Sequence, residues 1–128
     1  MQIRKVHHIA LICSDYSKSK DFYTRVLGFE VIREVYRADR DSYKLDLALN
    51  GAYGLELFSF PNPPIRPTQP EACGLRHLAF EVDNLEKAVD QLLSEGVSCE
   101  PIRLDIYTQK KFVFFFDPDH LPLELYEK

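Results

Sequence analysis

Residues 76–84 read RHLAFEVDN, and this stretch is a second copy of residues 6–15, which read VHHIALICSD. At an offset of 69 positions His77 aligns with His8, and the apolar residues that follow the two histidines align as well. A motif that recurs at a fixed offset indicates that the chain consists of two equivalent structural units.

The repeat continues to the end of each unit, where a glutamate recurs. The tetrapeptides LELF and LELY contain Glu56 and Glu124, which align at an offset of 68. His8 precedes Glu56 by 48 positions, and His77 precedes Glu124 by 47. Each unit therefore presents one histidine and one glutamate at nearly the same spacing.

Length and composition favour one domain over residues 1–128 that acts on a small molecule. The apolar share of 45% and the charged share of 28% are typical of a soluble globular protein. The longest apolar run, residues 112–116, is too short to span a bilayer, and nothing resembles an export signal. A net charge of −4 without a basic block argues against a nucleic-acid partner. A cytoplasmic protein is expected.

Hydrophobic periodicity predicts the order β-α-β-β-β for a first unit over residues 5–60. Alternating apolar residues predict a strand over residues 5–13. The apolar stripe after Asp15 predicts a helix that ends at Gly28. Three further strands are expected, over residues 30–37, 42–49 and 52–60.

Five of the eight prolines lie in residues 61–70, a density that excludes a helix or a central strand. We therefore expect a linker over residues 61–73 and a second unit over residues 74–128. The second unit should repeat the first, with a helix over 85–94 and strands over 75–82, 98–103, 111–116 and 123–126. The expected fold class is α+β, with two β-α-β-β-β repeats.

Strand alternation predicts that the repeated histidines and glutamates lie on the face of each sheet that points away from the helix. Leucines flank both Glu56 and Glu124, so the glutamates should point away from the apolar, helix-packed face of each sheet. His8 has the matching parity in its own strand. His7 has the helix-packing parity and His120 lies in a predicted turn, so neither is expected as a metal ligand.

Two imidazoles and two carboxylates form a mixed nitrogen and oxygen ligand set. Such a set suits Zn, Ni, Co, Mn or Fe rather than Ca. One histidine on a strand is more often structural, but the recurrence of the whole pair favours a metal site. We predict that His8, Glu56, His77 and Glu124 bind one divalent metal ion.

The order His, Glu, His, Glu in two such units resembles the vicinal oxygen chelate superfamily, and within it the glyoxalase I type, over the whole chain. LFSFP at 57–61 with EACGLRH at 71–77 is similar to the bacterial YaeR-type glyoxalase-like proteins. The resemblance implies the glyoxalase/bleomycin-resistance/dihydroxybiphenyl dioxygenase fold. In that fold the repeats form half-barrels around a metal site, and the chains are expected to pair as homodimers.

The resemblance also implies an activity, that of a lyase or isomerase that moves a proton through a metal-bound enediolate. The base would be a ligand glutamate, and Glu124 is favoured over Glu56. Glyoxalase I places an arginine four residues after its first histidine and an asparagine four residues after its first glutamate, and both engage glutathione. This chain has Ile12 and Phe60 there. With Phe58, they predict a less charged substrate than the glutathione hemithioacetal.

Other chemistries of the superfamily stay open at this point. They include an epimerase, an extradiol dioxygenase and a thiol transferase that acts on an antibiotic. The dioxygenases use two histidines and one glutamate, so a second glutamate argues against that alternative. A non-catalytic dimer that binds or sequesters a small molecule, as in bleomycin resistance, would lack the ligand set.

Overall fold

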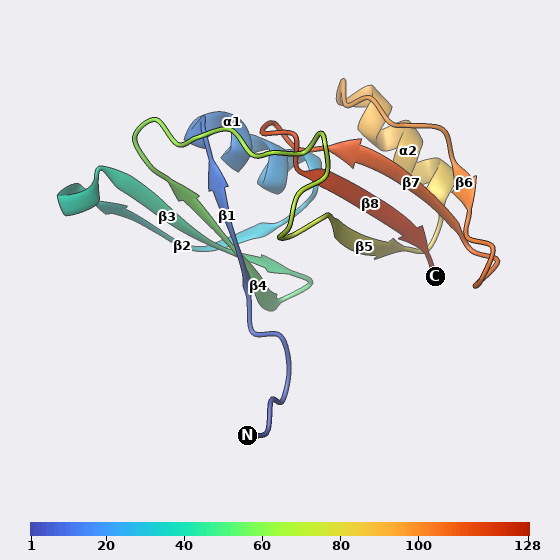
Figure 1. The fold of residues 1–128 in the computed structure, drawn as a ribbon, viewed down its shortest axis with the longest axis horizontal. Coiled ribbons are helices and arrows are strands. Elements are labelled where there is room, and N and C mark those ends of the chain that lie inside the picture. The colour runs from blue at the N-terminus through green and yellow to red at the C-terminus, as the bar shows by residue number, and fades with distance from the viewer. The chain divides into compact units, whose positions relative to one another are not determined.

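The two copies of the sequence repeat fold into two sheets of the same topology (Figure 1). The computed structural model describes residues 1–128, which form two units, Met1–Ile65 and Arg66–Lys128. The boundary between the units lies within residues 61–73, the segment that the sequence assigns to a linker.

The first unit contains β1 (Ile9–Cys13), α1 (Tyr16–Asp21), β2 (Glu30–Arg37), β3 (Ser42–Leu49) and β4 (Ala52–Ser59). Its four strands form one sheet in the order β1-β4-β3-β2. β1 is parallel to β4, and the other neighbouring strands are antiparallel. Two short elements complete the unit, a π-helix at Phe22–Val26 and a 3₁₀ helix at Ala38–Arg40.

The second unit contains β5 (Leu78–Val82), α2 (Leu85–Ser94), β6 (Arg103–Leu104), β7 (Lys111–Phe116) and β8 (Pro122–Glu127). The order of its strands, β5-β8-β7-β6, is that of the first sheet, again with one parallel pair, β5 and β8. The predicted α+β class with two β-α-β-β-β repeats is therefore confirmed.

The strand registers of the two sheets agree residue by residue around the repeated glutamates. Glu56 on β4 pairs with Ala10 on β1, and Glu124 on β8 pairs with Ala79 on β5. Since each alanine lies two residues after a repeated histidine, both units bring a histidine and a glutamate to the same place in the sheet. This placement was predictable from the repeat.

The helices are positioned by caps that also repeat. The Asp15 side chain accepts a hydrogen bond from the backbone N–H of Lys18 at 3.0 Å, and Asn84 does the same for Lys87 at 2.8 Å. Residues that flank the glutamates fill the cores: Leu55, Leu57, Leu123 and Leu125 are all at most 6% exposed. The glutamates consequently face away from the helix-packed side, as expected.

Several elements differ from the sequence prediction in type or in limits. The helix of the first unit continues after Asp21 as a π-helix, which hydrophobic periodicity does not distinguish from an α-helix. The strand expected over residues 98–103 is wrong: β6 is only Arg103–Leu104, with an isolated bridge between Cys99 and Phe115. The first strand of each unit begins one residue after its histidine, so both histidines lie at a strand entrance.

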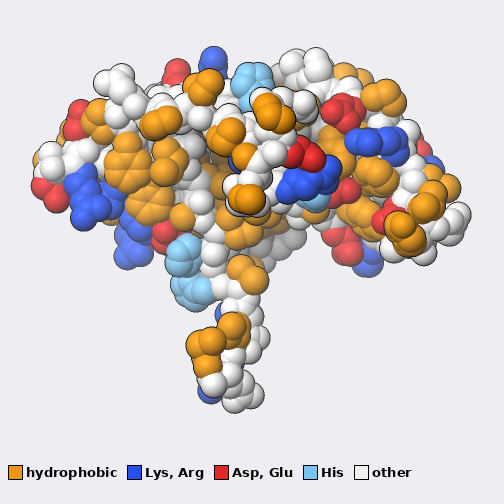
Figure 2. Space-filling model, viewed as in Figure 1, with side chains coloured by type: hydrophobic (Ala, Val, Ile, Leu, Met, Phe, Trp, Pro, Cys, Tyr) orange, Lys and Arg blue, Asp and Glu red, His pale blue; other side chains and the backbone are white.

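Charged and apolar side chains are interspersed on the face of the molecule drawn in Figure 2. Within neither unit do basic side chains form a continuous field in this view, in keeping with the net charge of −4. None of the helices is both long and apolar enough to cross a membrane.

Candidate metal centre

The histidine and glutamate of the first unit lie side by side. His8 Nε2 is 3.6 Å from Glu56 Oε2. Glu56 is 9% exposed, whereas His8 is exposed at the entrance of β1. A buried carboxylate needs a cationic or hydrogen-bonding partner, so this arrangement is typical of a metal ligand or of an ion pair.

The second unit repeats this pair with a shorter separation. His77 Nε2 lies 3.0 Å from Glu124 Oε2, and Glu124 is 8% exposed. The His77 ring also stands edge-on to Phe114, with 5.2 Å between ring centroids. With this contact to Phe114, the His77 ring presents Nε2 to the carboxylate.

The two separations can be compared with metal-ligand geometry. Donor atoms about 2.1 Å from one ion, at angles of about 90 to 110°, lie about 3.0 to 3.4 Å apart. The 3.0 Å of the second pair falls in this range, and the 3.6 Å of the first is a few tenths of an ångström longer. In each unit the histidine nitrogen and the carboxylate oxygen are thus separated by a distance close to that between two ligands of the same metal ion. No group of three or more His, Cys, Asp or Glu side chains in the structure is arranged so that it could hold a metal ion.

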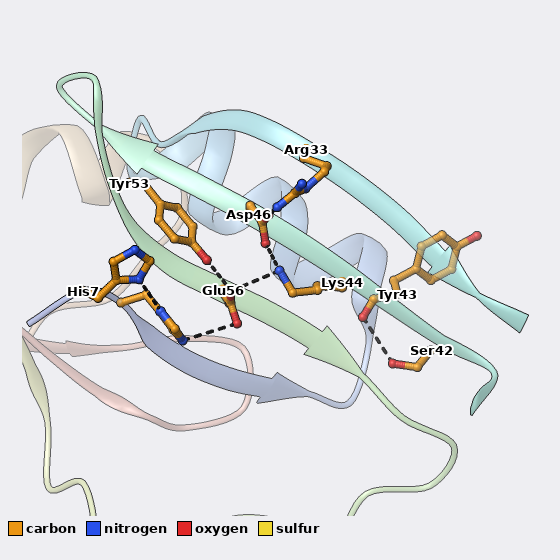
Figure 3. Close-up of polar contacts among 9 residues, drawn as sticks. His7, Arg33, Ser42, Tyr43, Lys44, Asp46, Tyr53 and Glu56 are labelled. Carbon is orange, nitrogen blue, oxygen red and sulfur yellow. Dashed lines mark hydrogen bonds and ion pairs between the residues drawn. The ribbon is translucent and has the colours of Figure 1, made fainter. Parts of the chain in front are cut away.

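Glu56 is further held by Tyr53 of its own strand, β4, and by Lys44 of the neighbouring strand β3 (Figure 3). The Tyr53 hydroxyl donates a short hydrogen bond to Oε1, and Lys44 Nζ lies 3.0 Å from the same oxygen. Burial raises the pKa of the Glu56 carboxyl group, but the hydrogen bonds from Tyr53 and Lys44 outweigh burial and lower the pKa below its ordinary value. Oε1 is therefore occupied, and Oε2 remains for His8 or a metal ion.

Glu124 has a different environment, although its place in the sheet is the same. The residue beside Glu56 on β3 is Asp46, whereas the residue beside Glu124 on β7 is Phe114. His77 is the one side chain in ion-pair contact with Glu124. The second carboxylate is consequently less constrained than the first.

Asp46 anchors the polar network of the first unit. The residue is 2% exposed, and its carboxylate accepts hydrogen bonds from Arg33 Nη2 at 2.8 Å and from Lys44 Nζ (Figure 3). Burial raises the pKa of Asp46, but the hydrogen bonds from Lys44 and Arg33 bring the pKa below its ordinary value. The network orients Lys44 toward Glu56.

Asp46→Asn should lower the free energy of unfolding by about 1.5 to 3 kcal/mol at pH 7, because the charge-assisted hydrogen bonds from Arg33 and Lys44 to this buried group are weakened. A carboxyl group with a depressed pKa in the folded state stabilises the protein above its unfolded pKa, and this contribution is lost as the pH falls through the folded pKa. The difference from wild type should therefore shrink below about pH 4. Urea unfolding at several pH values measures it. Asp39→Asn, at an exposed ion pair with Arg40, is the control and should change stability little.

The residues that surround the first pair are not predictable from the sequence repeat. His7, expected on the helix-packed face, is exposed instead, and its Nδ1 lies 2.8 Å from Nδ1 of His8. In the tautomer in which His8 donates this hydrogen bond from Nδ1, its Nε2 carries the lone pair that a metal ion needs. Lys44 was missed because its proximity to Glu56 depends on the pairing of β3 with β4, which the sequence does not display. Tyr53 was missed because it lies three residues before Glu56 on the same strand, where regular alternation predicts opposite faces, and the pairing of β3 with β4 is irregular at this point.

The residues predicted to line a substrate pocket are partly brought together. Ile12 pairs with Phe58 across β1 and β4, and it is 59% exposed. The Phe58 and Phe60 rings stack with centroids 6.2 Å apart, and the Arg37 guanidinium lies 5.0 Å and 5.7 Å from them. The predicted apolar surface therefore carries a cation over its aromatic rings.

The chain resembles known proteins over nearly its whole length. The family model described as "Glyoxalase/Bleomycin resistance protein/Dioxygenase superfamily" matches residues 5–125. The chain is 64% identical to the uncharacterized protein YwkD of Bacillus subtilis, over 100% of both chains, and 64% identical to the uncharacterized protein YaeR of Escherichia coli, over 98% of both. The crystal structure of a glyoxalase family protein from Enterococcus faecalis is 48% identical, covers 99% of this chain and 100% of its own, and has a TM-score of 0.91.

More distant relatives carry functional names. A lactoylglutathione lyase of Schizosaccharomyces pombe is 30% identical over 98% of this chain and 48% of its own length. The fosfomycin resistance protein FosX from Listeria monocytogenes, crystallised as a mutant with Mn(II) and a dihydroxypropylphosphonic acid, is 19% identical with a TM-score of 0.78. It covers 98% of this chain and 93% of its own. At this identity FosX shows the shared fold.

Proposed function

The chain belongs to the Glyoxalase/Bleomycin resistance protein/Dioxygenase superfamily, and on this premise we propose that it is a metal-dependent lyase or isomerase of the glyoxalase I type. It would act in the cytoplasm as a homodimer on a small molecule other than the glutathione hemithioacetal. The 128 residues would form one domain of two repeats.

The observation that carries this proposal is the duplicated pair of a histidine nitrogen and a buried carboxylate. The four residues His8, Glu56, His77 and Glu124 would hold one divalent ion, and their donor atoms suit Zn, Ni, Co, Mn or Fe. When bound, the ion supplies Lewis-acid stabilisation of negative charge on substrate oxygens.

The protein's own carboxylates would move the proton. A general base must be free to approach the carbon-bound proton that it removes. Tyr53 and Lys44 hold Oε1 of Glu56, whereas Glu124 has no comparable contacts beyond His77. This asymmetry supports Glu124 as the base and Glu56 as the fixed ligand.

A panel of thiol adducts of 2-oxoaldehydes tests the reaction class. The purified protein is freed of metal by a chelator, reconstituted separately with Zn, Ni, Co, Mn and Fe, and assayed for isomerisation of each adduct. We expect turnover that is lost with the chelator and restored by one or more of the metals. Failure of every metal to restore turnover, on adducts that vary in thiol and aldehyde, would contradict the proposal.

Ile12→Arg combined with Phe60→Asn should raise turnover of the glutathione hemithioacetal of methylglyoxal, because the two changes add the charged and amide groups with which glyoxalase I holds the tripeptide. Each added contact is expected to contribute about 1.5 to 3 kcal/mol, or roughly ten- to a hundredfold in kcat/KM. Steady-state kinetics of wild type and the double variant provide the measurement. A wild-type kcat/KM near the diffusional ceiling of about 10⁸ M⁻¹s⁻¹ would show instead that the native residues already suit this substrate.

A further inference from the structure

A cavity of about 150 Å³ lies in the second unit beside His77. A cavity of about this volume admits one benzene ring. Its walls combine basic and aromatic side chains, which include Arg66, Arg76, His77, Arg103, Phe114 and Phe116. His77, the histidine of the second pair, forms part of its wall.

The arginines of the cavity are not fully neutralised. Arg76 pairs with Glu71 at 2.8 Å, and Arg103 pairs with Glu100 at 3.0 Å. These two carboxylates also line the cavity, and no other acidic residue does, so three guanidinium groups face two carboxylates. The walls therefore carry one excess positive charge.

Arg66 is the guanidinium without an acidic partner. Its Nε donates to the Thr68 hydroxyl at 2.8 Å, and its Nη2 donates to the Leu75 carbonyl at 2.9 Å. Both acceptors are neutral, so the hydrogen bonds fix the plane of the group without cancelling its charge. An oriented guanidinium is suited to carboxylate and phosphate oxygens.

The aromatic side chains of the cavity supply an apolar surface. The Arg103 guanidinium lies 5.2 Å from the centroid of Phe114, whose edge-on contact also positions His77. Phe114 is thus a surface shared by the cavity and the metal ligand. An apolar or planar part of a bound molecule would rest against it, with an anionic group toward Arg66.

We infer that this cavity binds the anionic group of the substrate, and that the substrate is a small carboxylate or phosphate compound with an apolar body. The inference rests on the proposed function, since it assigns the substrate class for that site. It also explains how a chain without the glutathione-binding residues could hold a charged substrate: the charge is recognised in the second unit rather than at Ile12 and Phe60.

Binding of benzoate, phenyl phosphate and neutral benzamide to the full-length protein tests the inference. Calorimetric titrations are made on metal-free and metal-loaded samples. We expect at least one of the two anions to bind with a dissociation constant on the order of 1 mM, and benzamide to bind at least about tenfold more weakly. The preferred anion distinguishes a carboxylate substrate from a phosphate substrate.

Arg66→Met and Arg103→Met remove the charges but keep most of each apolar stem. Each should weaken binding of the preferred anion about tenfold or more, with little effect on benzamide. Arg40→Met, which removes an exposed arginine of the first unit, is the matched control and should leave binding unchanged. Arg66→Lys should retain part of the anion affinity. Thermal unfolding of each variant confirms that the fold is intact.

Equal affinities for benzamide and the anions, or anion affinities that neither Arg66→Met nor Arg103→Met changes, would overturn the inference. Bound metal is measured in the same samples. A protein that binds metal but not the anions would retain the proposed function and lose this assignment. A protein that binds the anions but no metal would retain this assignment and lose the proposed function. The two failures are therefore distinguishable.

Discussion

His77→Ala should release most of the divalent metal from the protein. One of four predicted donor atoms is lost, and Glu124 loses the side chain that faces its Oε2 at 3.0 Å. Removal of a direct ligand is expected to lower metal affinity by more than about a hundredfold, because loss of an outer-shell partner alone typically costs ten- to a hundredfold. Elemental analysis after dialysis against a weak chelator measures the effect.

His120→Asn is the matched control for this variant. His120 belongs to the same unit, is exposed, and has a left-handed backbone with a φ of 62°, a conformation that asparagine tolerates. The control should keep its full metal content. His7→Ala should fall between the two, with an affinity about tenfold below wild type, because His7 only orients His8. Equal metal content in wild type and His77→Ala would refute the assignment of His77.

The internal repeat made much of the fold predictable. A motif that recurs at a fixed offset constrains both halves at once, and strong turn signals such as Asn50-Gly51 set the strand limits. Segments with weak local signals were less predictable. The residues before β6 form one isolated bridge, from Cys99 to Phe115, so the strand itself contains only Arg103–Leu104. The pairs of histidine and glutamate followed from the repeat and from alternation along each strand.

The surroundings of the two pairs could not be predicted in the same way. Lys44 and Asp46 alternate with buried leucines like any polar residues on a half-buried strand, and only the pairing of β3 with β4 brings them beside Glu56. On β7 the place of Asp46 is taken by Phe114, which belongs to an apolar run typical of a buried strand. The two units therefore have the same predicted ligands, but different side chains contact the two glutamates. This difference depends on cross-strand register.

This difference leads to a large expected effect on catalysis. Glu124→Gln should lower kcat about a thousandfold or more even when the metal is saturating, because an amide cannot accept the proton that the base removes. Glu56→Gln should instead weaken metal binding, since Glu56 is the carboxylate whose Oε1 is fixed by Tyr53 and Lys44. The Glu56→Gln variant should therefore regain much of its activity as the metal concentration is raised.

Metal titrations of both variants, assayed with the best substrate of the adduct panel, separate the two roles. A loss of kcat that persists at the plateau identifies the base, whereas a shift of the midpoint identifies a ligand that only holds the ion. If Glu56→Gln were inactive at the plateau while Glu124→Gln kept more than about a tenth of wild-type kcat, the roles would be exchanged. The hydrogen bonds of Tyr53 and Lys44 to Glu56 would then have to break during turnover, and Tyr53→Phe would be expected to raise the rate rather than lower it.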